Sequence, residues 1–220
     1  METCAEQTVL VVERFDREWM DGSRWIARLP QEDFCQALGV PPEKKYEQHG
    51  GPGMKMCLQL LQGSTDPQDL RVFQLTQLAF WLLGATEGHA KNFSIFLQPS
   101  DSYVMTPLYD ILSMWPYAGV GPRQFRRKKA SLAMAVRSKN AHYAFDEIQT
   151  RHWHQLAMAN GGPDSWLAMQ ELIERVPVAL DTVRQRLPRR FNEELWNAIA
   201  GGMAAQVEKF RQGLKQVRET

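Results

Sequence analysis

The sequence predicts a mainly α-helical fold with a small β component. Apolar residues recur at three- and four-residue steps through most of the second half of the chain, which is the period of helices that bury one face. Short apolar runs bounded by turn residues occur near the N-terminus and in the middle of the chain, and such runs are typical of strands. With 220 residues and 44% hydrophobic content, the chain is long enough to bury one full core. We therefore expect a single domain over residues 1–220.

The N-terminal part, residues 1–60, is expected to be mixed in structure. A strand is predicted at about 8 to 14, where the first apolar run lies. An irregular stretch follows, and a helix is predicted near 32 to 38, where acidic residues precede an apolar segment. Helices are expected to dominate the remainder, residues 61–220.

One long helix is predicted at the start of this helical part. Asp66-Pro67 suits a helix start, and the apolar residues that follow define one buried face: Leu70, Phe73, Leu78, Trp81 and Leu82. The helix delivers the chain to a loop that ends at Glu87. A long buried helix is a stiff support, so this loop is a good place for catalytic residues.

A β-hairpin is predicted directly after the loop. Residues 93–98 and 103–105 read as short strands, and the turn-forming run 99–102 separates them. A hairpin brings the residues that flank its two outer ends together. Asn92 and Asp110 should therefore meet at the open end.

Glu87, Asn92 and Asp110 then converge in the pattern of a phosphoryl-transfer site. In such a site one acid accepts or orients the hydroxyl proton, while an Asn and a second acid hold Mg²⁺ against the phosphates. The catalytic loop of protein kinases places its Asn five residues after the catalytic acid, as Glu87 and Asn92 are placed here. Lys91 is expected to neutralise phosphate charge. The alternative is an ordinary set of turn residues, whose side chains bond only the local backbone.

The C-terminal part is expected to be helical. A short helical turn is predicted at 111–116, and longer helices are predicted at 143–158, 165–187 and 192–218. Pro177 should kink or split the middle one of these three.

Several segments of this sequence resemble the HipA family of serine/threonine kinase toxins. The run LGATEGHAKNFSIF at 83–96, followed by TPLYDI at 106–111, is similar to the catalytic region of that family. Further similar segments lie at 12–17, 28–33, 45–47, 50–53, 132–134 and 176–181. The resemblance implies the C-lobe of a protein-kinase-like fold. In that fold the strand in 1–60 is the hinge strand, and the hairpin segment 87–110 carries the catalytic-loop and metal-site residues.

The resemblance also implies individual roles. Glu87 stands where the family has its catalytic aspartate, and Asn92 and Asp110 stand where it has its magnesium-binding pair. Two further residues fall in segments that line the phosphates of ATP, namely His89 and Tyr109. The stretch that runs along the adenine is matched by Glu13, Arg14 and Phe15.

Two departures from the family put activity in doubt. Glu87 replaces an aspartate and moves the carboxylate outward by one methylene, roughly 1.5 Å, and displacements of about 1 Å at a reacting centre cost ~10²-fold in rate. The 220 residues also contain no glycine-rich phosphate loop and no strand lysine ahead of Glu13. The glycine cluster at 50–53 fits neither common phosphate-loop motif, and Pro52 removes one amide donor, so it is interpreted as an ordinary loop entering a helix. We therefore expect a separate chain to supply the N-lobe and this chain alone to be inactive.

Two functions of different classes follow from these observations. The first is the catalytic lobe of a HipA-type kinase toxin, which transfers the γ-phosphate of ATP to a Ser or Thr of a translation-related protein such as an aminoacyl-tRNA synthetase. Its inhibitor would be a HipB-like helix-turn-helix antitoxin, through which alone it would meet DNA. The second is a non-catalytic, pseudokinase-like module that binds an antitoxin or a partner kinase.

Composition and charge argue against several other classes of protein. A formal net charge of +1 implies no general attraction to nucleic acid or to anionic membranes. The cysteines Cys4, Cys35 and Cys57 are odd in number and scattered, which indicates neither a disulfide framework nor a zinc site. No targeting or membrane-spanning segment is visible, so we expect a cytoplasmic protein.

Overall fold

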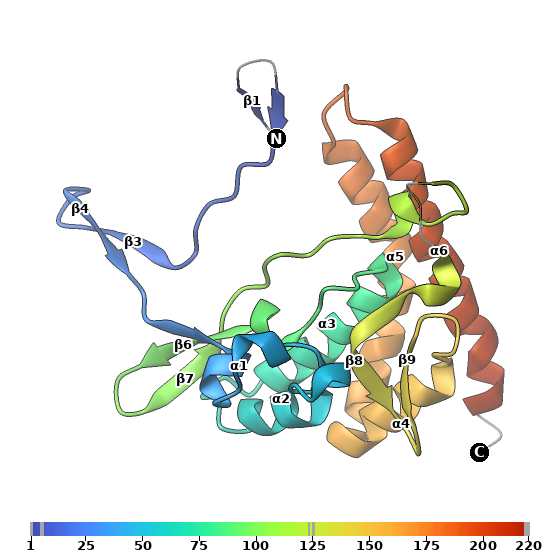
Figure 1. The fold of residues 1–220 in the computed structure, drawn as a ribbon, viewed down its shortest axis with the longest axis horizontal. Coiled ribbons are helices and arrows are strands. Elements are labelled where there is room, and N and C mark those ends of the chain that lie inside the picture. Colours follow the sequence, from blue (N-terminus) through green and yellow to red (C-terminus); the bar gives the residue numbers. More distant parts are fainter. Residues whose placement is uncertain (1, 5–6, 123, 125, 218–220) are drawn as a thin grey trace.

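The computed structural model describes residues 2–4, 7–122, 124 and 126–217, and it is mainly helical (Figure 1). The predicted fold class, mainly α with a small β component, is confirmed. The α-helices of the described part are α1 (Phe34–Ala37), α2 (Met54–Leu61), α3 (Asp69–Leu83), α4 (Thr150–Asn160), α5 (Gly162–Arg186) and α6 (Glu193–Val217). None of the helices in these residues combines the length and apolarity needed to cross a bilayer.

The strands of the described residues form small antiparallel sheets. The sheets are β1 (Glu2–Cys4) with β2 (Gln7–Val9), β3 (Arg17–Met20) with β4 (Trp25–Arg28), β5 (Gln31–Asp33) with β6 (Ser94–Gln98) and β7 (Ser102–Met105), and β8 (Ser131–Arg137) with β9 (Ala141–Ala144). Figure 1 shows the β1–β2 and β3–β4 hairpins standing away from the helical body, while the β5–β6–β7 and β8–β9 sheets lie against it.

Helix α3 runs through the centre of the core and fixes the loop that follows it. Trp81 on this helix is fully buried and donates from Nε1 to the carbonyl of Phe145 at 3.3 Å. The helix ends at Gly84, whose φ of +66° is left-handed. A Cβ at this position would lie 2.8 Å from the ring of Trp115, so only glycine lets the chain turn here with Trp115 packed against it.

The segment after Asp110 caps the C-terminal end of α3. Its donors are the hydroxyl of Ser113, the backbone N–H of Met114 and the indole of Trp115, which bond the last carbonyls of the helix at 2.6, 3.0 and 2.9 Å. These bonds satisfy carbonyls that a helix end otherwise leaves unpaired. They also tie the chain on both sides of the predicted site to one rigid element.

The predicted hairpin is present as β6–β7, with Ile95 opposite Met105. A third strand, β5, pairs with β6 on its other edge, so the expected helix at 32 to 38 is shorter than predicted. It is α1, which begins after Asp33, whose side chain accepts from the backbone N–H of Gln36 and forms its N-cap.

Two further predicted elements are wrong in extent. The strand at 8 to 14 is limited to β2, and Val12 after it is 70% exposed, with no strand in the described residues to pair with. Residues 143–158 do not form one helix, because Tyr143 and Ala144 belong to β9 and α4 begins only at Thr150. The buried strand β8 needs a hydrogen-bonded partner, and β9 provides it.

The remaining helices match the prediction more closely. Helix α5 continues on both sides of Pro177, so the residue does not split it. Helix α6 follows the predicted third helix, although Arg218 lies outside the described residues. The helical turn at 111–116 is displaced, because the short 3₁₀ helix spans Trp115–Tyr117 and contains the proline expected to end it.

Candidate active site

Asn92 and Asp110 meet as the hairpin predicts. The side-chain Nδ2 of Asn92 donates to Oδ2 of Asp110 at 3.0 Å and to the backbone carbonyl of Glu87 at 2.8 Å. Both N–H groups of the amide are thereby used, which directs its oxygen away from these partners. Asn92 is only 7% exposed, so its orientation is held firmly.

Asp110 has an unusual backbone conformation for a residue with a side chain. Its φ of +55° lies in the left-handed region, which costs a non-glycine residue about 1 kcal/mol. Residues held in such conformations cluster at functional sites, where the surrounding structure fixes them. Here the hairpin on one side and the α3 cap on the other hold the chain, and the conformation points the carboxylate at Asn92.

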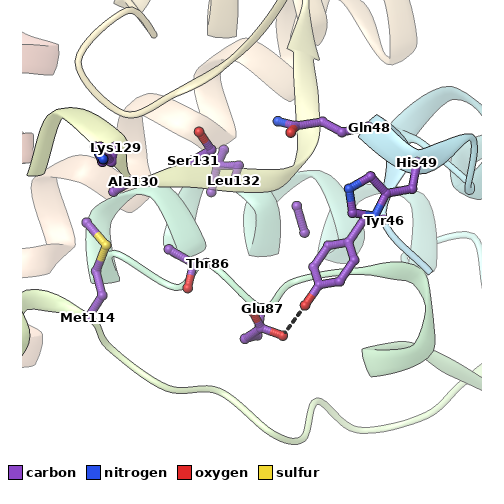
Figure 2. A pocket seen from close by; sticks show the side chains of 11 residues that line it. Tyr46, Gln48, His49, Thr86, Glu87, Met114, Lys129, Ala130, Ser131 and Leu132 are labelled. Atoms are coloured by element: carbon purple, nitrogen blue, oxygen red, sulfur yellow. Dashed lines mark hydrogen bonds between the residues drawn. The ribbon is translucent and has the colours of Figure 1, made fainter. Parts of the chain in front are cut away.

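The carboxylate of Glu87 is not directed at Asn92. Its Oε2 accepts a hydrogen bond of 2.6 Å from the hydroxyl of Tyr46, which lies 41 positions earlier in the sequence (Figure 2). Nε2 of His89 lies 3.6 Å from the same oxygen, which is too long for a hydrogen bond. The side chain of Glu87 is 46% exposed and lines the pocket beside it.

The rings around Glu87 are uncharged at neutral pH. Burial lowers the pKa of His89, and the nearby Lys45 lowers it further, against the opposing effect of Glu87. The contact between His89 and Glu87 is therefore not an ion pair at pH 7. Burial, and after it the bond to Glu87, raises the pKa of Tyr46 to about 12, which keeps its hydroxyl protonated as a donor.

Lys91 is already paired in this structure. Its Nζ lies 2.6 Å from Oδ2 of Asp33, the residue that caps α1. The backbone carbonyl of Lys91 accepts from the hydroxyl of Tyr109 at 2.9 Å, and that hydroxyl lies 2.6 Å from Oγ of Ser94. Burial raises the pKa of Tyr109, so this hydroxyl also stays neutral. The predicted phosphate-neutralising role of Lys91 stays a prediction.

A polar pocket of about 350 Å³ lies on the Lys91 side of the segment 87–110. The predicted adenine stretch reaches it, since Glu13, Arg14 and Phe15 line it together with Lys91 and Tyr109. The ring of Phe15 lies 5.8 Å from that of Tyr109 and 5.9 Å from that of Phe96. Phe15 thus has an aromatic support that fixes its position in the pocket wall.

A second pocket, of about 420 Å³, lies on the Glu87 side. Its apolar wall consists of Met114, Ala130, Leu132 and Ala133. The polar residues that line it are Tyr46, Gln48, His49, Thr86, Glu87, Lys129 and Ser131 (Figure 2). Residues 130–133 belong to the beginning of β8 and the turn before it. His89 does not line this pocket or the first one, although it touches both Tyr46 and Glu87.

The side-chain oxygen atoms of Asn92 and Asp110, which we call the centre of the site, suit a hard cation. Mg²⁺ binds through one or two protein oxygens and completes its shell with water and phosphate oxygens. The amide oxygen of Asn92 and the carboxylate of Asp110 offer such a set. Within the described residues no group of three or more His, Cys, Asp and Glu side chains is placed to hold a metal by itself.

Sequence reasoning missed Tyr46 and Asp33 as parts of the site. Asp33 carried a usable signal, because an Asp directly before an apolar segment favours a helix N-cap. Tyr46 lies in the segment 45–47 that resembles the family, but nothing in the sequence indicated its contact with Glu87, which depends on how residues 45–50 fold against β8. Glu47 fixes that segment by accepting from the backbone N–H of Ala135 at 2.7 Å and by pairing with Arg137.

Comparison with known proteins shows which family the chain resembles. Residues 1–185 match the HipA-like C-terminal domain. The chain is 43% identical over 128 residues to the putative kinase Y4mE of Sinorhizobium fredii, an alignment that covers 56% of this chain and 30% of that protein. It is 34% identical over 120 residues to the serine/threonine-protein kinase toxin HipA of Shewanella oneidensis, covering 49% of this chain and 28% of that protein.

A solved structure agrees with these relatives in fold. It is the complex of HipA, HipB and operator DNA from Shewanella oneidensis MR-1, which aligns at a TM-score of 0.79 and 24% identity over 94% of this chain and 50% of that chain. The alignments span about 30% of the length of the curated relatives. The match over residues 1–185 covers most of this chain, and the chain therefore belongs to the family of HipA-like C-terminal domains.

Proposed function

We propose that this chain is the catalytic lobe of a HipA-type serine/threonine kinase that transfers the γ-phosphate of ATP to a protein hydroxyl. The observation that carries the proposal is the contact of Asn92 with Asp110, at 3.0 Å, beside the loop that bears Glu87. An amide oxygen, a metal-binding acid and a proton-accepting acid are the parts that phosphoryl transfer requires of this lobe. The family membership supports the same reaction class.

In this proposal the polar pocket receives the nucleotide. Phe15 packs against the adenine, and the backbone of Glu13 and Arg14 reads the base edge. Lys91 lies toward the phosphates, with Tyr109 holding the backbone of Lys91 in place. His89 does not line this pocket, so its contact with the phosphates requires them to extend beyond the pocket toward Glu87. Asn92 and Asp110 are the residues that would hold Mg²⁺, and the ion would supply positive charge beside the phosphates.

The pocket in Figure 2 receives the acceptor side chain. Glu87 is the acid that borders it, so its free carboxylate oxygen takes the hydrogen bond of the incoming Ser or Thr hydroxyl. Orienting this hydroxyl directs its oxygen at the γ-phosphate, and the carboxylate accepts the hydroxyl proton as the new O–P bond forms and the bond between the γ-phosphorus and ADP breaks. The acceptor would be a translation-related protein such as an aminoacyl-tRNA synthetase.

The proposed partners are those of a kinase toxin. A lobe outside these 220 residues would supply the glycine-rich loop and the strand lysine that hold the phosphates. A HipB-like helix-turn-helix antitoxin would inhibit the kinase and connect it to operator DNA. The solved relative, HipA in a complex with HipB and operator DNA, motivates this part of the proposal.

A phosphorylation assay tests the reaction. The chain is combined with the lobe that carries the phosphate-binding lysine, radiolabelled ATP, Mg²⁺ and a candidate synthetase. Labelled protein is expected, and Glu87→Gln should reduce labelling by ~10²- to 10⁴-fold, the usual contribution of a catalytic base. Glu43→Gln is the matched control, because Glu43 is an exposed acid that lines neither pocket.

One observation favours a second candidate, a non-catalytic binding module. The carboxylate of Glu87 is bonded to Tyr46 and the ammonium of Lys91 is paired with Asp33, so both groups are engaged within the chain. The same assay separates the two functions. Absence of labelling together with retained binding of the antitoxin would support the module and contradict the kinase.

A further inference from the structure

We infer that Tyr46 is a positioning residue for Glu87, which holds the longer acid at the place where the acceptor hydroxyl is bound. The inference rests on the proposed function. Its direct observation is the hydrogen bond of 2.6 Å from the Tyr46 hydroxyl to Oε2 of Glu87 (Figure 2). This bond uses one carboxylate oxygen of a side chain that lines the pocket.

Tyr46 is itself held rigidly enough to position another side chain. Its ring packs edge-on against the ring of His89 at 5.0 Å and against that of His49 at 5.7 Å. Its backbone carbonyl accepts from the N–H groups of His49 and Gly51, both at 3.0 Å. Next to it, Glu47 is bonded to β8 through Ala135. The hydroxyl of Tyr46 is therefore at a fixed place in the pocket wall.

The length of Glu87 explains why such a support matters. A glutamate has one more rotatable bond than an aspartate, and its half-exposed carboxylate would otherwise sample several rotamers. A hydrogen bond to a fixed donor selects one of them, and placement to within about 0.5 Å decides the efficiency of a catalytic group. An aspartate on the same backbone would end roughly 1.5 Å short and lose the bond to Tyr46.

Residues 46 and 87 should therefore be energetically coupled. Tyr46→Phe keeps the ring contacts and removes only the hydroxyl. In the chain with Glu87 it should lower kcat about tenfold, the value of one hydrogen bond, and leave KM for ATP unchanged. In a Glu87→Asp background, where the bond is already lost, the same substitution should change kcat by less than about twofold.

A double-mutant cycle in the active kinase assembly measures this coupling. The four proteins are the natural chain, Tyr46→Phe, Glu87→Asp and the double variant, and kcat and KM for ATP are determined for each. Tyr117→Phe is the matched control, because Tyr117 is 62% exposed and lines neither pocket. It should leave both constants unchanged in either background.

Each outcome decides the inference. A loss that is large in the chain with Glu87 and small in the Glu87→Asp background supports it. An equal loss in both backgrounds, no loss, or a rise in KM for ATP with unchanged kcat overturns it and leaves the proposed kinase reaction standing. If the natural chain transfers no phosphate in the assembly, the proposed function fails first and the inference fails with it.

Discussion

The two pockets that border the segment 87–110 differ in kind. The pocket on the Lys91 side is lined mainly by charged and polar side chains, and two of its cations are paired with acids, Arg14 with Asp16 and Lys91 with Asp33. The pocket on the Glu87 side has an apolar wall, and the partner of its acid is the neutral hydroxyl of Tyr46. A charged donor suits the first pocket, and an uncharged hydroxyl suits the second. Only the centre, Asn92 with Asp110, should matter to both substrates.

The centre should show the largest effect. Asp110→Gly removes the carboxylate proposed to bind the metal, and we expect kcat to fall on the order of 10³-fold, the scale of losing a dominant electrostatic group. Stability should change little, because glycine relieves the strain of a φ of +55°, about 1 kcal/mol, while the lost bond to Asn92 costs about as much. Kinase assays and thermal unfolding of the same preparation measure the two quantities.

Asp101→Gly is the control for that substitution. Asp101 lies in the exposed turn of the β6–β7 hairpin with a φ of +56°, so it presents the same backbone conformation without the site. Its replacement should leave activity intact. Equal activity of Asp110→Gly and the natural chain would show that the centre does not serve phosphoryl transfer.

This centre could be predicted from the sequence because it depends on local structure. Turn-forming residues at 99–102 fix a hairpin, and a hairpin joins the residues at its open end, so the contact of Asn92 with Asp110 follows from neighbouring residues alone. The contact of Tyr46 with Glu87 and the strand β9 could not be predicted in this way, because both depend on tertiary packing. Tyr46 reaches Glu87 only because Glu47 docks on β8, and β9 is a strand because buried β8 needs a partner.

On the nucleotide side, Lys91 should have the next largest effect. Lys91→Met removes a cation from the polar pocket, and we expect KM for ATP to rise about tenfold with a smaller change in kcat, because one charge-assisted hydrogen bond is lost. Steady-state kinetics at varied ATP concentration measures both constants.

The pairing of Lys91 with Asp33 requires its own control. Asp33→Asn breaks the ion pair but retains a side-chain oxygen that can cap α1. KM for ATP should not rise in this variant, since the ammonium remains. A rise as large as that of Lys91→Met would mean that the ion pair, and not the charge of Lys91, matters to the nucleotide.

Phe15 should have a smaller effect on the same side. Phe15→Ala removes the ring that packs on Tyr109 and Phe96, and we expect KM for ATP to rise by a few-fold, the value of one aromatic contact. Phe15→Leu should restore most of the affinity, because an apolar side chain again covers the base. A fall in kcat at unchanged KM would place Phe15 outside the nucleotide site and remove the distinction between the pockets.

The smallest effect concerns the ionisation of Tyr46 on the acceptor side. Burial is the main cause that raises its pKa to about 12, and the bond and charge of Glu87 add to it. Glu87→Gln removes the negative charge, which makes tyrosinate less unfavourable. The pKa should therefore fall, but only part of the way toward the ordinary value of 10.0, because burial is unchanged.

Ultraviolet absorbance of tyrosinate during an alkaline titration measures this shift. Subtracting the curve of Tyr46→Phe isolates the signal of Tyr46 from those of the other tyrosines. Because the raised pKa favours the folded state, its contribution to stability is complete below pH 10 and is lost as the pH rises through about 12. The same midpoint in the natural chain and in Glu87→Gln would mean that the two side chains do not touch in solution. Glu87 would then lack the neutral hydrogen-bond partner by which we distinguish the proposed acceptor pocket from the proposed nucleotide pocket.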